Sequence, residues 1–114
     1  MKYVLMFVET EEFAKEFEAM GPAERELAYQ RVYQWFDEHA STITNRGAKL
    51  QPAETATTVR LDGDAPLTTD GPYIEGKEVI SGFVEIDVAD LDEALRIVKA
   101  WPGCPVVEIR PVES

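Results

Sequence analysis

The segment Val79–Val88 constrains the fold of this 114-residue chain more than any other. Its apolar residues recur at every second position, which is the period of a β-strand with one buried face. One face would carry Ile80, Gly82, Val84, Ile86 and Val88, and the other would carry Ser81, Phe83, Glu85 and Asp87. Phe83 indicates that the second face is partly covered as well. The chain must therefore build a sheet with a core against this strand.

The first half of the chain predicts a strand followed by helices. Lys2–Val8 is short, apolar and rich in aromatic and β-branched residues, as in a buried strand. A short helix is expected over about residues 13–20, and a longer one from Pro22 to about Arg46, with Gly47 as its C-terminal stop. Because Gly21–Pro22 separates them, one helix broken at this point fits equally well. The longer helix would carry an apolar stripe, with residues three or four apart or at a larger helical spacing: Ala28, Val32, Trp35 or Phe36, and Ile43.

The second half of the chain predicts mostly strands. Thr55–Leu61 alternates, the following residues 62–64 favour a turn, and Leu67–Thr69 would be the return strand. After Val79–Val88, Asp90 is placed to cap a helix that ends near residue 101. Pro105–Val112 reads as a last strand, with Val107 and Ile109 facing inward.

The order of these elements predicts one domain over residues 1–114 with the βαββαβ arrangement of a ferredoxin-like fold. This is an α+β fold in which helices cover one face of an antiparallel sheet. The other face needs a cover, and the chain has no further segment to supply it. A second copy of the protein is the economical cover, so a homodimer is expected.

Composition narrows the classes of partner and of site. The net charge of −11 opposes binding to nucleic acid and to anionic membranes, and no apolar run approaches the ~20 residues of a membrane span. The short apolar run Tyr3–Val8 does not resemble a secretion signal, which makes a cytoplasmic location the default. With one histidine and Cys104 as the single cysteine, one chain cannot form a zinc finger or a two-histidine metal triad. No glycine-rich phosphate loop is present, so no cofactor is expected.

One stretch carries a resemblance to a known family. Residues 69–78 read TDGPYIEGKE and lead into Ser81-Gly82-Phe83. This closely resembles the signature of the DGPF-type branch of the YCII-related family, with Tyr73 in place of the usual Phe and Ser81-Gly82 in place of a Gly pair. Residues 50–60, 90–95 and 107–112 resemble the segments that flank this signature in the family. The resemblance therefore covers nearly the whole chain.

The resemblance implies a fold more than a function. Family members are dimers in which two ferredoxin-like sheets face each other across a cavity, the dimeric α/β barrel architecture. The wider superfamily includes small-molecule oxygenases and a dehydrochlorinase. An enzymatic activity is therefore suggested by analogy alone.

The signature segment also concentrates ionisable groups. If it lines a cavity, Asp70 could be a general base, and Lys77 with Arg60 could hold an anionic group of a small molecule. Tyr73 would supply a flat wall and a hydroxyl. Glu75 and Glu78 complete the candidate ligand-binding set. The structural alternative is that Asp70-Gly71-Pro72 is ordinary turn chemistry and that the charges after it form a solvated face.

His39 is a second candidate catalytic residue. In the wider YCII family, a histidine on the first helix pairs with an aspartate near the cavity as an acid–base dyad. By spacing, the family position falls nearer Phe36 in this chain. His39 lies on or beside the apolar stripe of its predicted helix, so a packed structural histidine is the alternative.

The sequence thus supports a dimeric small-molecule-binding protein and leaves open whether it is an enzyme. One hypothesis is a cofactor-independent acid–base enzyme, similar to a lyase or an isomerase, that uses a cavity near the DGPY loop. The alternative is a non-catalytic module that binds an effector or a protein partner. Replacing the Asp70 carboxyl separates these hypotheses, because it should abolish turnover in an enzyme but only weaken binding in a sensor.

Overall fold

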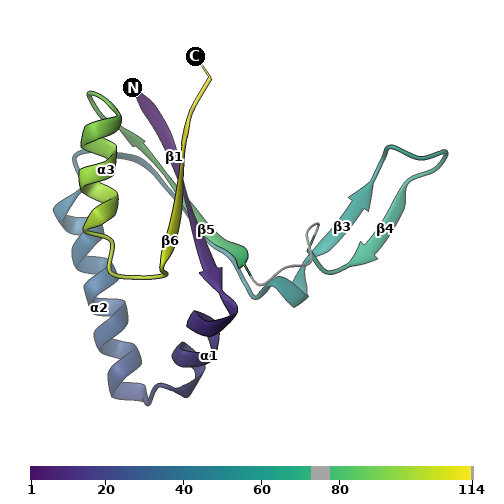
Figure 1. Cartoon of the computed structure of the whole chain (residues 1–114), viewed down its shortest axis with the longest axis horizontal. Coiled ribbons are helices and arrows are strands. Elements are labelled where there is room, and N and C mark those ends of the chain that lie inside the picture. The colour runs from purple at the N-terminus through teal and green to yellow at the C-terminus, as the bar shows by residue number, and fades with distance from the viewer. Residues whose placement is uncertain (73–77, 114) are drawn as a thin grey trace.

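The computed structural model describes residues 1–72 and 78–113 (Figure 1). The chain folds into six strands, three α-helices and one short 3-10 helix within these ranges. The elements are β1 (Lys2–Thr10), α1 (Glu11–Ala19), α2 (Pro22–Glu38), β2 (Ile43–Lys49), η1 (Ala53–Thr55), β3 (Thr57–Arg60), β4 (Leu67–Asp70), β5 (Glu78–Asp87), α3 (Leu91–Lys99) and β6 (Val106–Pro111).

Four strands form one antiparallel sheet in the order β2-β5-β1-β6. The central strand β1 pairs with β5 on one side, where Leu5 lies opposite Val84, and with β6 on the other, where Leu5 lies opposite Ile109. Strands β3 and β4 form a separate two-stranded sheet. The expected ferredoxin-like α+β class, with an antiparallel sheet and helices, is confirmed.

The second strand of the large sheet is not the one that the sequence predicted. The long helix ends at Glu38 rather than near Arg46, and Ile43–Lys49 is strand β2. Thr42, Ile43 and Thr44 are consecutive β-branched residues, which suit a strand better than a helix interior. Pairing of Ile43 with Ile86 then lets Ile43 pack against the core from the sheet.

Gly47 is correspondingly not a helix stop. It lies inside β2 with φ +63°, beside an irregularity in the pairing of β2 with β5. Glycine tolerates this left-handed backbone conformation, which often accompanies a β-bulge. Of the two alternatives for the preceding helices, the structure has two separate helices, with Gly21 as the N-cap of α2 and Pro22 in its first turn.

The core lies between one face of the sheet and the helices. Alternate residues of β1 and β5 point into it and meet Trp35 of α2 and Ala94 of α3. The buried apolar set is Tyr3, Leu5, Phe7, Trp35, Val84, Ile86, Val88, Ala94, Ile97 and Cys104. The inward direction expected for Val107 and Ile109 is confirmed, since both pack against this set.

Ile80 departs from the face on which the alternation of β5 placed it. Gly82 lies opposite Phe7, but Ile80 lies opposite Val8, because the pairing of β1 with β5 shifts between Phe7 and Val8. The extra residue, Ser81, is buried, and its hydroxyl lies 3.3 Å from the Phe7 carbonyl oxygen. A one-residue shift moves a side chain to the opposite face of a sheet. Ile80 is consequently exposed on the face away from the helices.

Viewed along its shortest dimension, the molecule has three parts side by side (Figure 1). The helices lie on one side of the sheet and the β3–β4 hairpin extends on the other. The shortest dimension is 18 Å, close to the width of four strands spaced about 4.8 Å apart. The sheet is therefore seen edge-on, and its second face looks towards the side from which the hairpin projects.

Candidate functional site

The β3–β4 hairpin, called here the arm (residues 57–70), carries two of the predicted site residues. Thr57 lies opposite Asp70 and Arg60 lies opposite Leu67. The base of the arm is closed by a hydrogen bond from the Gly71 amide to the Ala56 carbonyl, 2.7 Å, and by one from the Thr58 hydroxyl to the Gly71 carbonyl, 2.6 Å. These two hydrogen bonds extend the pairing of the hairpin to its base.

Arg60 and Asp70 do not converge within one chain. Residues directly opposite in a hairpin share a face, and the faces alternate along each strand. Asp70 therefore shares a face with Thr57, whereas Arg60, three residues further along β3, lies on the opposite face. Asp70 is exposed at the base of the arm, and the Arg60 guanidinium lies 3.9 Å from the Asp62 carboxylate near the tip.

The turn after Asp70 has the geometry that its sequence suggests. Gly71 has φ +100°, a backbone conformation that residues other than glycine rarely adopt. Pro72 follows it and fixes its own φ. These features agree with the alternative that Asp70-Gly71-Pro72 is ordinary turn chemistry. They also place Asp70 where the arm joins the rest of the chain.

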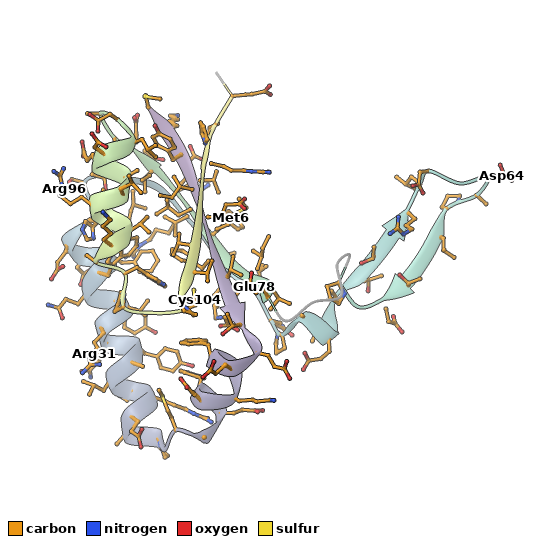
Figure 2. The ribbon with its side chains drawn as sticks, in the orientation of Figure 1. Met6, Arg31, Asp64, Glu78, Arg96 and Cys104 are labelled. Carbon is orange, nitrogen blue, oxygen red and sulfur yellow. The ribbon has the colours of Figure 1, made fainter. Side chains whose placement is uncertain are left out.

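The remaining residues of the signature are only partly placed. Tyr73, Glu75 and Lys77 lie outside the described residues. Glu78 is the first residue of β5, lies opposite Thr10, and is exposed. It is on the face that looks away from the helices, at the end of the sheet next to the arm (Figure 2).

His39 lies on the other side of the sheet. It is the C-cap of α2, where its Nδ1 lies 2.8 Å from the Trp35 carbonyl oxygen and its ring centroid lies 5.0 Å from that of Trp35. The helix α2 and the arm are on opposite sides of the sheet (Figure 1). One chain therefore does not bring His39 together with Asp70.

The sheet face away from the helices, called here the open face, has an apolar middle bordered by charged residues. Its middle is formed by Met6 of β1, which lies opposite Phe83 of β5. Met6 points to the side of the arm, whereas Arg31 and Arg96 lie on the helix side (Figure 2). The apolar residues of the open face are Val4, Met6, Val8, Ile80, Phe83 and Val106. No helix of the described chain covers them.

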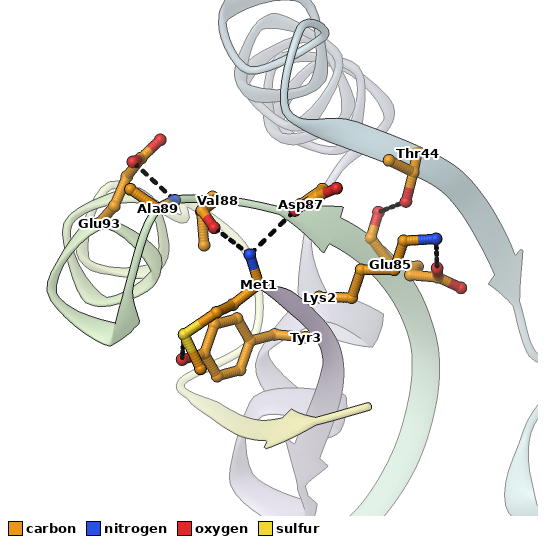
Figure 3. A network of polar contacts seen from close by, with 9 residues as sticks. All are labelled: Met1, Lys2, Tyr3, Thr44, Glu85, Asp87, Val88, Ala89 and Glu93. Carbon is orange, nitrogen blue, oxygen red and sulfur yellow. Dashed lines mark hydrogen bonds and ion pairs between the residues drawn. The ribbon is translucent and has the colours of Figure 1, made fainter. Parts of the chain in front are cut away.

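Carboxylates at the far end of the open face are paired with cations (Figure 3). Asp87 lies 3.1 Å from the N-terminal ammonium, and Glu85 lies 4.0 Å from the Lys2 ammonium. On β6, Glu108 lies 3.3 Å from the Arg110 guanidinium. These three carboxylates thus have cationic partners, although the whole chain has a net charge of −11.

Sequence reasoning missed a shallow feature on the arm. Val59, Arg60, Leu61 and Asp62 line a wide, open hollow. Val59 and Leu61, which the alternation placed on a common strand face, are both exposed. The alternation of Thr55–Leu61 was the available signal, but a two-residue period alone does not show whether a strand face is covered.

Neither a cluster of metal-ligating side chains nor a membrane-spanning helix is found among the described residues. Within residues 1–72 and 78–113, no three His, Cys, Asp or Glu side chains gather closely enough to hold a metal ion. No helix in the part of the chain that the structure describes is long and apolar enough to span a membrane.

The sheet order and the helices together define a ferredoxin-like α+β domain with an inserted hairpin arm. The model of the YCII-related domain matches residues 1–113, and the chain belongs to the YCII-related family. An uncharacterised protein of Rhizobium meliloti is 39% identical to the chain over 69 residues, which make up 57% of this chain and 56% of that protein. The chain thus spans just over half the length of this relative.

Proposed function

We propose that this protein is a homodimer of the DGPF-type branch that binds a small molecule between two open sheet faces. The two sheets would face each other as in a dimeric α/β barrel, and the arm base with Asp70 and Glu78 would border the cavity. The single observation that carries the proposal is the open face itself. An apolar patch of this kind on a small domain marks an interaction site.

A second copy fits the open face better than an unrelated partner. The fold already buries one side of the sheet with the chain's own helices, and the other side exposes the large apolar side chains Ile80, Phe83 and Val106. Two-fold pairing would bring each apolar middle against its equivalent. The paired carboxylates at the edge reduce the repulsion expected between two chains of net charge −11.

Sedimentation velocity at micromolar concentration tests the dimer. We expect a dimer for the native chain and a monomer for Phe83→Glu, because a carboxylate would be buried in the centre of the interface. Leu95→Glu is the matched control: Leu95 is 37% exposed on α3 and Phe83 is 38% exposed on the open face. A native monomer, or equal effects of the two substitutions, would contradict the proposed interface.

Binding is favoured over catalysis by the exposure of Asp70. In one chain Asp70 is exposed at the base of the arm, whereas a general base must be enclosed with its substrate. A catalytic role would need the second chain to cover it. The cations assigned to the site, Arg60 and Lys77, favour a ligand with a carboxylate group.

Thermal unfolding with acetate, malonate and benzoate as probes tests this class of ligand. A probe at about 100 times its dissociation constant stabilises the folded protein by about 2.7 kcal/mol. We expect at least one probe to raise the melting temperature, and Arg60→Gln to reduce that rise. Arg31→Gln, an exposed residue on the helix side, is the control and should leave the rise unchanged. Equal shifts in both variants would remove Arg60 from the site.

A further inference from the structure

Among the residues that the structure describes, the arm packs against no other helix or strand to an extent comparable with the contact between its own two strands. All residues from Val59 to Asp70 are exposed. The radius of gyration is 16.1 Å, whereas a compact domain of this length has about 13 Å. The arm thus accounts for an unusually extended molecule.

An isolated hairpin of this kind is marginally stable in water. Two strands alone bury too little surface to offset the ordering of their backbone, which costs roughly 1–2 kcal/mol per residue. The arm nevertheless presents large apolar side chains, with Leu61 75% exposed and Leu67 56% exposed. Within residues 1–72 and 78–113, no surface covers these side chains.

The direction of the arm identifies that surface. The arm projects on the same side as the open face, with its tip at Asp64 far from the sheet (Figures 1 and 2). Any molecule seated on the open face is therefore flanked by the arm. If that molecule is a second copy, as the proposed function holds, its own arm flanks the first chain in return.

We propose that the arms are exchanged in the dimer, each docking on the partner subunit and completing the partner's ligand site with Arg60. This inference rests on the proposed homodimer. It explains how one site can use both Arg60 and Asp70, although the two residues lie on opposite faces of one arm. After exchange, Asp70 of one chain and Arg60 of the partner subunit can line the same cavity. The docked face of the arm carries Arg60 and Leu67, which lie opposite each other in the hairpin.

Hydrogen exchange measured by mass spectrometry tests the exchange of arms. In the native dimer, amides of residues 57–70 should exchange at least about tenfold more slowly than in the Phe83→Glu monomer, because docking protects a hairpin that otherwise opens freely. Leu95→Glu should retain the protection. Equal exchange of the arm in the native dimer and the monomer would overturn the proposal while leaving the dimer intact.

A substitution on the arm provides the second measurement. Leu67→Glu should raise the dissociation constant of the dimer at least about tenfold, since it places a carboxylate in the docked surface. Leu27→Glu on α2 is the control, because Leu27 is 49% exposed on the helix side. If the native chain is a dimer and Leu67→Glu dissociates like the control, the arm does not dock on the partner. If the native chain is a monomer, the proposed function itself fails.

Discussion

Gly47 of β2 lies so close to Phe83 of β5 that a Cβ on it would approach the Phe83 carbonyl oxygen to 1.8 Å. The irregular pairing of β2 with β5 brings the two backbones together at this point, directly beside the apolar middle of the open face. The fold of the edge strand and the shape of the open face therefore depend on the same glycine.

Gly47→Ala should destabilise the fold by more than about 2 kcal/mol, because both the positive φ and the contact with Phe83 oppose a side chain. Urea unfolding followed by circular dichroism measures the change. Gly63→Ala is the control, since a Cβ there would meet nothing nearer than the Ala65 carbonyl oxygen at 3.8 Å. Similar losses in the two variants would show that β2 adjusts more easily than this geometry implies.

Trp35→Phe should reduce the free energy of unfolding by about 2–4 kcal/mol. The Trp35 indole N–H donates to the Ile97 carbonyl oxygen, 3.0 Å away, and the ring lies edge-on to Phe7 and Trp101. The smaller ring would lose this hydrogen bond and leave a cavity between α2 and α3. Tyr33→Phe on the exposed side of α2 should change stability by less than about 0.5 kcal/mol. Chemical denaturation measures the unfolding free energy of both variants, and equal losses would contradict this prediction.

Asp90→Ala should cost about 0.5–2 kcal/mol through loss of a helix cap. The Asp90 carboxylate accepts a hydrogen bond from the Glu93 amide, 2.9 Å, at the start of α3. Asp92→Ala removes the same charge from the first turn without removing the cap, and serves as the control. The thermal midpoint should fall further for Asp90→Ala. An equal fall would assign the effect to charge alone.

Alkaline pH should weaken the fold through Cys104. Burial raises the pKa of this thiol above its ordinary value of 9.0. Because the folded-state pKa exceeds the unfolded one, the stabilisation is fully present below the unfolded pKa and is lost as the pH rises through the folded pKa. The difference in unfolding free energy between the native chain and Cys104→Ala should therefore shrink above about pH 9. A difference independent of pH would show that the thiol is not desolvated in the folded state.

The same burial predicts slow chemistry at Cys104. The thiolate is the reactive form, so the native chain at pH 8 should react with iodoacetamide far more slowly than the urea-unfolded chain. Equal rates in the two states would contradict the buried position of the thiol.

Local sequence patterns predicted those elements whose apolar period is unbroken. Strands β1, β5 and β6 and helix α3 fall where alternation, helical spacing and the Asp90 cap indicated. In contrast, β2 could not be recognised, since Ile43 is its only large apolar residue and the rest of the strand is exposed. Its strand conformation is imposed by the free edge of β5, which supplies the hydrogen-bonding partners.

For the candidate site too, the sequence indicated some features and could not indicate others. The signature segment drew attention to Asp70 and Glu78, and both lie near the junction of the arm and the open face. The positions of Arg60 and His39 relative to Asp70 could not be foreseen. They depend on the face of a hairpin and on the side of a sheet, and these are set by contacts between segments distant in sequence.

By itself, the sequence determined the α+β class, the strands β1, β5 and β6, the helix α3, the turn at Gly71 and the family resemblance, because each depends on local periodicity or on a short motif. The tertiary structure decided which strands share a sheet, the side of the sheet to which Ile80 turns, and the projection of the arm. Each of these follows from long-range backbone pairing, in which a shift of one residue redirects a side chain to the opposite face.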